Sequence, residues 1–377
     1  PSQQRRRRGG FGLSASTVRR WLGRLFLGLV VMLTILTALP LVETDEWWVR
    51  LWDYPRLQIA VLLAVGLLGL VFSGPRKGRL FFAATGFGLA SLVWQLIQVA
   101  SYVPGWPVEL AATKRCAPGR QLRLLNANVL MTNNEAGALL ALVHRTNPDV
   151  ILLLEPGLDW ERAMRPLYPA YPHRIGQPLP NTYGLILLSR LPLERPQLRY
   201  LMQPQVPSVK AGLRLRSGEV IDFYGIHPEP PYPGDDSGER DAELVRVGRE
   251  VRESGRAAIV MGDLNDVAWS HSSRLFRRLS GVLDPRVGRG PYPTFPAHLP
   301  LLAWPLDHIF VTPHFRLLSI DRLPDIGSDH LPMLFTLCLA NDPNQRLTDD
   351  AASADDREDA RDQVEEGVEE RAEENNG

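Results

Sequence analysis

The stretch that decides the fold runs from residue 257 to residue 266 and reads AAIVMGDLND. Its apolar start predicts a buried strand. Because side chains alternate along a strand, Asp263 and Asn265 are expected on the same side, where each presents an oxygen atom. Gly262 would let the backbone approach a ligand closely, and hard cations such as Mg²⁺ prefer carboxylate and amide oxygens. The same residue types also form ordinary turns, so this interpretation depends on the rest of the chain.

Short apolar runs separated by turns surround this stretch, from about residue 122 to residue 340. Amphipathic helices are predicted at 134–146 and 240–254, where apolar residues recur at helical spacing. Numerous strands with few helices favour two packed sheets with helices outside them. The predicted strands are residues 122–128, 150–154, 184–189, 220–226, 257–261, 306–311 and 333–339.

Three apolar segments precede this region, at residues 22–42, 57–72 and 80–100. Each is close to the roughly 20 residues that cross a hydrocarbon core, although the middle segment is marginal. They are apolar all round, which disfavours helices that are buried in a soluble core. A cleaved signal peptide would not be followed by two more such segments. We therefore predict three transmembrane helices.

Charged residues are distributed unevenly, although the formal net charge of the 377 residues is zero. Arginines crowd the N-terminus, and Arg76, Lys77 and Arg79 fill the second loop, whereas the first loop is acidic. The positive-inside rule then places the N-terminus and the second loop in the cytoplasm. Three spans put everything after Tyr102 outside the cytoplasm.

These patterns predict five parts along the chain. A basic cytoplasmic N-terminus (1–21) is followed by a three-helix transmembrane anchor (22–102) and a linker (103–121). The domain of short strands (122–340) comes next, and an acidic tail (341–377) ends the sequence. The tail is poor in apolar residues and without periodicity, so we expect it to be disordered.

The two cysteines, Cys116 and Cys338, lie before the first predicted strand of the domain and within its last predicted strand. If these strands are antiparallel neighbours, an oxidising compartment would allow a disulfide that closes almost the whole domain. Two unpaired buried thiols are the alternative, because pairing cannot be deduced from sequence.

Polar side chains recur at the ends of the predicted strands. Carboxylates, amides and histidines placed in this way can converge on one rim of a sheet. Glu155 follows four aliphatic residues, and a carboxylate is costly to bury there unless it is paired, solvated or bound to a metal. The strand-end residues are Asn128, Glu155, His227, Asp263, Asn265, Asp307, Asp329 and His330.

The ordered set of these motifs resembles the endonuclease/exonuclease/phosphatase superfamily, which includes the DNase I-like nucleases. The resemblance implies a DNase I-like four-layer α/β sandwich, with two packed mixed sheets flanked by helices, preceded by the three transmembrane helices. The three spans resemble the membrane-anchored bacterial members, which implies a multi-pass protein of the bacterial inner membrane. The resemblance covers residues 122–339 and is carried by the segments 126–129 (NANV), 148–155 (PDVILLLE), 183–189 (YGLILLS), 225–227 (GIH), 262–266 (GDLND), 306–310 (LDHIF) and 327–332 (GSDHLP).

The resemblance also implies a metal site. Glu155 would be a ligand of Mg²⁺ or Mn²⁺, with Asn128 and Asp329 nearby. No other cofactor is implied.

The remaining motif residues would carry the chemistry. The resemblance implies that His330 is a general base that activates water, held in the right tautomer by Asp307. His227 would donate to a phosphate oxygen or to the leaving group. Asp263 and Asn265 would position the nucleophile and the phosphate, although in some relatives the aspartate at position 263 is argued to be the base.

Other basic residues are weaker candidates. His308 is expected to point away from the face of Asp307 and to pack in the core. Five arginines form either a phosphate-binding edge or a solvated helix face, and the absence of interleaved aromatic residues favours the second. They are Arg274, Arg277, Arg278, Arg286 and Arg289.

Hydrolysis of a phosphodiester bond by activated water is the function that these residues favour. The substrate is either nucleic acid or a phospholipid headgroup, and the balanced charge of the domain does not favour a polyanionic surface. A non-catalytic binding domain on the same fold is the alternative from another class. The lipid bilayer is expected as a partner of the three apolar helices.

Overall fold

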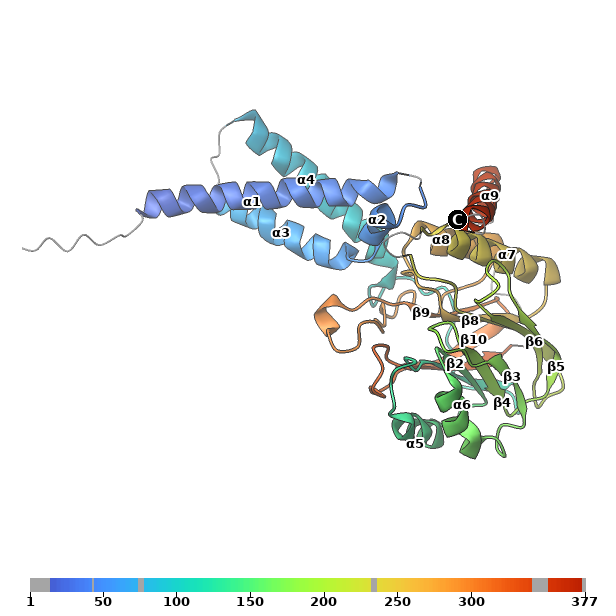
Figure 1. The fold of residues 1–377 in the computed structure, drawn as a ribbon. Helices are drawn as coiled ribbons and strands as arrows, with labels where there is room; N and C mark the ends of the chain where they lie inside the picture. Colours follow the sequence, from blue (N-terminus) through green and yellow to red (C-terminus); the bar gives the residue numbers. More distant parts are fainter. Residues whose placement is uncertain (1–13, 43, 74–77, 232–235, 341–351, 375–377) are drawn as a thin grey trace, which may run out of the picture. The chain divides into compact units, whose positions relative to one another are not determined.

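The computed structural model describes residues 14–42, 44–73, 78–231, 236–340 and 352–374 (Figure 1). The chain divides into two compact units. One contains Pro1–Val42 and Pro55–Gln98, and the other contains Glu43–Tyr54 and Val99–Gly377.

The first unit contains three helices that are long and apolar enough to cross a membrane: α1 (Ala15–Ala38), α3 (Arg56–Ser73) and α4 (Arg79–Val99). Their buried polar groups bond to one another. Arg56 donates from Nη1 to Oε1 of Gln95 (3.2 Å), and Gln95 donates from Nε2 to Oγ1 of Thr37 (3.0 Å). These bonds tie the three helices together at one level, because a polar side chain is costly to bury without a partner.

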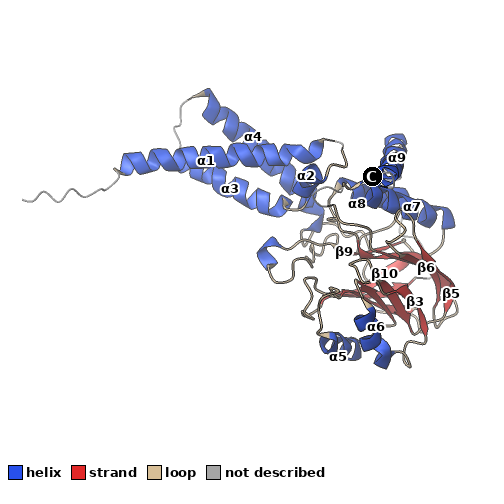
Figure 2. Cartoon of the chain, viewed as in Figure 1, coloured by secondary structure: helices blue, strands red, loops and turns tan. Residues whose placement is uncertain are grey.

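The second unit is built on two mixed sheets (Figure 2). In the first, the order is β10-β11-β1-β2-β4-β3, and in the second it is β5-β6-β7-β8-β9. The first sheet consists of β1 (Gln121–Asn128), β2 (Val150–Leu154), β3 (His173–Gln177), β4 (Leu185–Ser189), β10 (Phe315–Arg322) and β11 (Met333–Leu339). The second consists of β5 (Leu193–Arg199), β6 (Ser208–Arg214), β7 (Val220–Ile226), β8 (Ala258–Asp263) and β9 (Asp307–Val311).

Helices cover the outer face of each sheet. The helices α5 (Ala136–Thr146) and α6 (Leu158–Met164) pack on the first sheet, and α7 (Gly238–Ser254) and α8 (His271–Ser280) pack on the second. The largest buried apolar cluster lies between the two sheets. This arrangement confirms the predicted four-layer sandwich.

The strand directions bring particular chain ends to one edge of the sandwich. β1 is parallel to β2, and β7 is parallel to β8, so each pair ends on the same side. β9 and β11 run antiparallel to β8 and β1, and they therefore begin where those strands end. Most of the strand-end residues that the sequence singles out meet at this edge.

Every predicted strand is present, with small differences at the ends, and four further strands were missed. β3, β5 and β10 lie at the edges of their sheets, and β5 contains only half-buried and exposed residues, with a proline inside. Edge strands bury little apolar surface, so they lack the continuous apolar run that identifies a central strand. The fourth missed strand is β6, beside β5.

The expectation of a disordered tail is wrong for part of it. Helix α9 (Ala354–Glu374) packs against α7, with Ala360 buried in a small apolar cluster. Its acidic residues find basic partners: Asp356 lies 2.8 Å from Arg278, and Asp359 lies 2.6 Å from His271. Tertiary ion pairs therefore order a segment that composition alone marks as disordered. Residues 341–351 and 375–377 lie outside the described residues.

The predicted boundary of the anchor also differs from the structure, because Glu43–Tyr54 belongs to the second unit. Trp269 donates from its indole nitrogen to the carbonyl oxygen of Asp53 (2.8 Å). On the other side of α4, Tyr102 donates to the carbonyl oxygen of Ala268 (3.0 Å). The segments that flank α3 and α4 are thus part of the sandwich, and a fragment without them would lose these contacts.

Cys116 and Cys338 form a disulfide, with 5.6 Å between their Cα atoms. The condition stated for pairing is met, because β1 and β11 are antiparallel neighbours and Gln121 lies opposite Cys338. The structure therefore selects the disulfide over two free thiols.

Gly262 fits the structure for a reason other than the expected one. It lies opposite Ile226 of the parallel strand β7, and an added Cβ would overlap the Ile226 carbonyl oxygen. The glycine therefore allows a close approach between two strands. Gly262 directly precedes Asp263, the last residue of β8, so the close strand approach at Gly262 fixes the position of the Asp263 carboxylate.

Candidate active site

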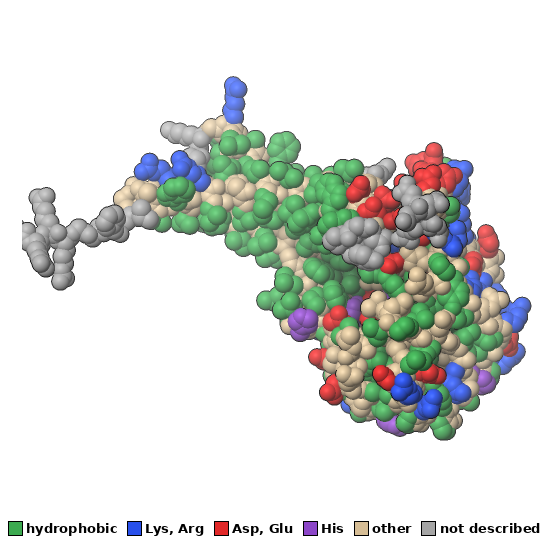
Figure 3. Space-filling view, viewed as in Figure 1, with side chains coloured by type: hydrophobic (Ala, Val, Ile, Leu, Met, Phe, Trp, Pro, Cys, Tyr) green, Lys and Arg blue, Asp and Glu red, His purple; other side chains and the backbone are tan. Residues whose placement is uncertain are grey.

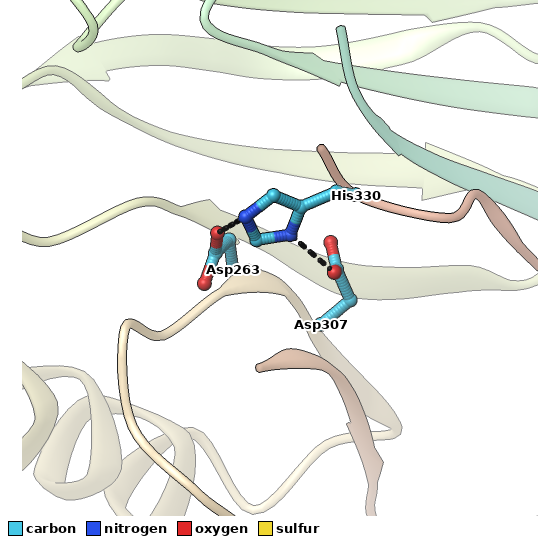
Figure 4. Close-up of side chains that lie close together, drawn as sticks. All are labelled: Asp263, Asp307 and His330. Atoms are coloured by element: carbon cyan, nitrogen blue, oxygen red, sulfur yellow. Dashed lines mark hydrogen bonds and ion pairs between the residues drawn. The ribbon is translucent and has the colours of Figure 1, made fainter. Parts of the chain in front are cut away.

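Three buried side chains meet at the edge where β8 ends and β9 begins (Figure 4). Asp263 closes β8, Asp307 opens β9, and His330 lies in the loop before β11. The imidazole of His330 lies between the two carboxylates, with Nδ1 2.8 Å from Oδ2 of Asp307 and Nε2 3.5 Å from Oδ2 of Asp263. All three are at most 5% exposed. The predicted pair of Asp307 and His330 is therefore assembled.

Further contacts fix the orientation of His330 and Asp307. Asn126 of β1 donates from Nδ2 to the other oxygen of Asp307 (2.9 Å), and Ser328 accepts a hydrogen bond from the His330 amide (3.1 Å). The Phe295 ring packs on the imidazole, with 4.7 Å between the ring centroids. Neither Asn126 nor Phe295 is among the site residues predicted from the sequence. Asn126 precedes Asn128 by two residues, so strand alternation offered a signal for it, whereas nothing local marks Phe295.

The ionisation of Asp263 and His330 is linked. Burial raises the pKa of Asp263, and the neighbouring imidazole opposes this. Burial acts to lower the pKa of His330, but the carboxylates of Asp263 and Asp307 outweigh it and raise the pKa. Since each group favours the charged form of the other, the pair can hold a proton between them. In its deprotonated form such a pair can accept a proton from a water molecule, and the two carboxylates then stabilise the imidazolium.

His227 lies beside this pair, directly after β7. Its Nε2 is 4.0 Å from Oδ2 of Asp263, and the ring of Tyr183 lies 6.4 Å away between centroids. Burial and the nearby His330 lower the pKa of His227 to about 4. It is therefore a neutral imidazole near neutral pH, and its buried Nδ1 has no hydrogen-bond partner among the described residues. A neutral imidazole in this position can donate one hydrogen bond.

A second group of oxygen atoms lies at the ends of β1 and β2. Asn128 donates from Nδ2 to Oε1 of Glu155 (2.7 Å) and, at 3.4 Å, to Oδ2 of Asp263. The other Glu155 oxygen, Oε2, is buried without a hydrogen-bond partner among the described residues. Burial raises the pKa of Glu155, and the negative charge of half-buried Asp329 raises it further.

These residues fit a hard divalent cation. A buried carboxylate oxygen without a donor is costly, and a bound cation would remove this cost. Glu155 and Asp329 supply carboxylates, which is the donor chemistry that Mg²⁺ and Mn²⁺ prefer. The amide oxygen of Asn128 accepts a hydrogen bond from the Leu130 amide (3.0 Å), so this side chain would have to turn to present its oxygen to a cation. Asp263, Asp307 and His330 also place one ligand atom each within 4.8 Å of one another, so a cation could be held there instead. In that group the imidazole already hydrogen-bonds to Asp307 and lies 3.5 Å from the Asp263 carboxylate.

Asn265 is the predicted site residue that the structure places differently. It lies beyond β8 in a left-handed backbone conformation with φ 48°, so strand alternation does not apply to it. Its backbone amide donates to Oδ1 of Asp263 (2.9 Å), and its side chain donates to the carbonyl oxygen of Pro228 (2.9 Å). The side chain therefore fastens the loop after β7, and the backbone positions Asp263.

The carbonyl oxygen of Asn265 is held from the opposite side. Tyr54 donates to it from its hydroxyl group (2.5 Å), and Arg240 of α7 donates from Nη1 (3.0 Å). Arg240 is buried and also pairs with Asp241 (2.8 Å). Tyr54, the residue before Pro55 and α3, thus supports the loop that carries Asp263.

Replacing Tyr54 with phenylalanine is expected to lower kcat by roughly two- to tenfold, because one hydrogen bond of net value ~0.5–1.5 kcal/mol is lost from the loop. Hydrolysis of a soluble phosphodiester by the full chain would measure this. Tyr168→Phe is the matched control, since the Tyr168 hydroxyl also donates to a backbone carbonyl, that of Glu161, but on α6. Equal activity of the Tyr54 and Tyr168 variants would contradict the positioning role.

The weaker candidates lie outside this group. His308 is fully buried and contacts Arg286 (2.7 Å) and the Asp266 carbonyl oxygen (2.9 Å), so its predicted packing role is confirmed. The five arginines form neither a phosphate-binding edge nor a solvated face, because each bonds within the protein. Their partners are Trp269 O for Arg274, Glu109 for Arg277, Asp356 for Arg278, Asp284 for Arg286 and Leu110 O for Arg289.

Comparison with known proteins gives an independent assignment. Residues 125–330, more than half of the chain, match the model of the Endonuclease/Exonuclease/phosphatase family. The chain belongs to this family. Members of the endonuclease/exonuclease/phosphatase superfamily are hydrolases that act on phosphodiester bonds, and they are typically dependent on a divalent metal.

The fold of this chain resembles that of a solved structure of the endonuclease/exonuclease/phosphatase superfamily. A humanised D. rerio TDP2 is 18% identical and covers 58% of this chain and 99% of its own, with a TM-score of 0.50. The human Nocturnin catalytic domain with bound sulfate is 17% identical and covers 59% of this chain and 95% of its own, with a TM-score of 0.49. No curated protein matches the sequence.

Proposed function

We propose that this protein is a membrane-anchored, divalent-metal-dependent phosphoesterase that hydrolyses phosphodiester bonds with activated water, in the manner of the endonucleases. The observation that carries the proposal is the buried imidazole of His330 between Asp307 and Asp263. A phospholipid-type phosphodiesterase is the second candidate, and a non-catalytic binding domain is the third. A phosphoesterase needs a proton acceptor, charge neutralisation and leaving-group assistance, and the site offers a residue for each.

His330 is the proposed general base. Asp307 fixes its tautomer, because a hydrogen bond to Nδ1 leaves Nε2 to face the reacting water and Asp263. Asp263 orients the same water or shares the proton with His330. The Asn265 amide holds the Asp263 carboxylate in place.

His227 is proposed to donate a hydrogen bond to a phosphoryl oxygen or to the leaving group. Its pKa is lowered to about 4, so it is a neutral donor at the pH at which His330 would act as a base. Glu155, Asn128 and Asp329 are proposed to hold Mg²⁺ or Mn²⁺, which would neutralise charge on the phosphoryl oxygens.

Replacing Glu155 with glutamine tests the metal site. Glutamine keeps an oxygen that can accept from Asn128 but removes the charge, so we expect the affinity for Mn²⁺ to fall by roughly tenfold or more. Calorimetric titration of the full chain in detergent measures binding, and hydrolysis of bis-p-nitrophenyl phosphate with Mg²⁺, Mn²⁺ or EDTA measures activity. Asp159→Asn, at an exposed acid of α6, is the control. Unchanged Mn²⁺ affinity in the Glu155 variant would place the metal elsewhere.

The three apolar helices are proposed to span the bacterial inner membrane, with the second unit outside the cytoplasm. The disulfide fits an oxidising compartment, and the arginine-rich flanks fit a cytoplasmic N-terminus. Reporter fusions placed after Tyr102 should be active in the periplasm. Reporter activity in the cytoplasm would contradict this topology.

A further inference from the structure

A loop next to the candidate base ends in an apolar tip. Phe295 and Trp304 close the loop by an isolated bridge, and their backbones exchange hydrogen bonds of 3.1 and 2.6 Å. The tip holds Leu299, Leu301 and Leu302, whose exposed fractions are 47%, 89% and 49%. We refer to residues 295–304 as the leucine loop.

The stem of the leucine loop contacts the catalytic residues. Phe295 packs on the ring of His330, and the amide of Ala297 donates to the carbonyl oxygen of Asp329 (2.7 Å). Leu301 is the sixth residue after Phe295, so the tip lies within ~20 Å of the stem even if the chain is fully extended. A partner that binds the tip of the leucine loop is therefore held near the candidate active site.

The composition of the leucine loop fits an apolar partner and not a polar one. No aspartate or glutamate occurs between Asp284 and Asp307, and the tip itself carries only His298 as a polar residue. Figure 3 shows hydrophobic side chains gathered where Figure 1 draws this loop in orange. Large apolar side chains grouped on a surface mark a partner or a membrane, because leaving them in water is unfavourable.

A second exposed apolar segment follows helix α4, the last of the three candidate membrane helices, and is hydrogen-bonded near the leucine loop. Val103, Trp106 and Val108 are each about half exposed, at 54%, 50% and 49%, and they lie four, seven and nine residues after the end of helix α4. This segment is hydrogen-bonded to the turn that precedes the leucine loop, since the amide of Gly105 donates to the carbonyl oxygen of Gly288 (3.2 Å). Tryptophan beside an apolar span is typical of the boundary between lipid and water.

From these observations we infer that the leucine loop inserts its tip into the bilayer surface, and that the substrate is a phosphodiester in a lipid headgroup. The inference rests on the proposed phosphodiester hydrolysis and names its substrate class. Apolar side chains of interfacial segments enter roughly 5–10 Å into the boundary between headgroups and acyl chains. With the tip there, the stem beside His330 lies toward the headgroup layer, where the phosphodiester of a phospholipid is found.

The insertion is tested on the full chain in vesicles of phosphatidylcholine and phosphatidylglycerol. A Leu301→Cys variant carries an environment-sensitive fluorophore, with the native disulfide left oxidised. Leu158→Cys is the matched control, because Leu158 lies on α6, is 56% exposed and is remote from the leucine loop in sequence. Lipids with a nitroxide on the acyl chain should quench the Leu301 probe and leave the Leu158 probe unchanged.

The substrate class is tested by activity in the same vesicles. The triple variant Leu299→Ser, Leu301→Ser, Leu302→Ser should hydrolyse phosphodiester lipids roughly tenfold more slowly than the unmodified chain, because each serine removes apolar surface from the bilayer contact. Hydrolysis of bis-p-nitrophenyl phosphate reports whether the catalytic residues are intact, and circular dichroism reports folding. A DNA oligonucleotide added to the vesicles is the competing substrate.

The outcomes separate the inference from the function it rests on. Two probes that are equally exposed to water in vesicles would overturn the insertion. The proposed lipid partner would also be wrong if nitroxide lipids failed to quench the Leu301 probe while the oligonucleotide shielded it from water. The same holds if the probe were shielded only when the protein density is raised, which would indicate a second copy of the chain. Absence of any phosphodiester hydrolysis would overturn the function and the lipid substrate, while nitroxide quenching would still establish the insertion.

Discussion

Replacement of His330 by alanine is expected to lower kcat for a phosphodiester by roughly 10²–10⁴-fold, which is the usual contribution of a general base. The imidazole hydrogen-bonds to Asp307 through Nδ1, and its Nε2 lies 3.5 Å from the carboxylate of Asp263, so it lies between the two acids. Without it the site retains two buried carboxylates but loses the shared proton acceptor. The measurement is single-turnover hydrolysis of bis-p-nitrophenyl phosphate by the full chain with saturating metal.

The control must separate lost chemistry from lost folding. Removing the imidazole leaves two carboxylates close together, which destabilises the folded protein, so thermal unfolding of the variant is measured alongside activity. His330→Gln adds a variant that keeps a hydrogen-bonding side chain without a basic nitrogen. His144→Ala, on the exposed side of α5, is the matched histidine control.

If a folded His330→Ala protein retained full activity, the base assignment would fail and Asp263 would become the candidate. If His144→Ala lost as much activity as His330→Ala, the effect would have no connection to the site.

Removal of the disulfide is expected to have the second large effect. Cys116 and Cys338 are separated by 222 residues, so the bond closes a loop that contains nearly the whole sandwich. Restriction of an unfolded loop of this length predicts ~5 kcal/mol of stabilisation, and measured losses are typically about 2–5 kcal/mol. The double variant Cys116→Ser, Cys338→Ser should therefore unfold at a lower denaturant concentration than the oxidised protein.

Reduction of the unmodified protein with a thiol provides the control for the disulfide. It should lower the unfolding midpoint toward that of the double serine variant, and it should have no further effect on that variant. The disulfide does not touch the active site, so kcat under native conditions should stay within about twofold. Equal stability of the oxidised and reduced proteins would show that the bond does not constrain the unfolded chain.

Local sequence determined much of this protein. A continuous aliphatic run such as residues 150–154 predicts a strand that is buried on both faces, and the structure has β2 at these positions. The three long apolar segments predicted helices long and apolar enough to cross a membrane, and the structure has such helices at these positions. Polar residues at strand ends, such as Glu155, His227 and Asp263, could be recognised in the sequence because each ends an apolar run. Strand pairing then gathers them at one edge.

Tertiary structure decided the features that depend on distant partners. Acidic residues of α9 are ordered by Arg278 and His271, and Arg286 is buried because Asp284 and His308 surround it. The role of Asn265 follows from a left-handed turn that strand alternation does not predict. Each of these outcomes rests on contacts between residues far apart in sequence or on a local backbone conformation. Periodicity and composition describe neighbours along the chain, whereas the energy of a buried charge depends on neighbours in space.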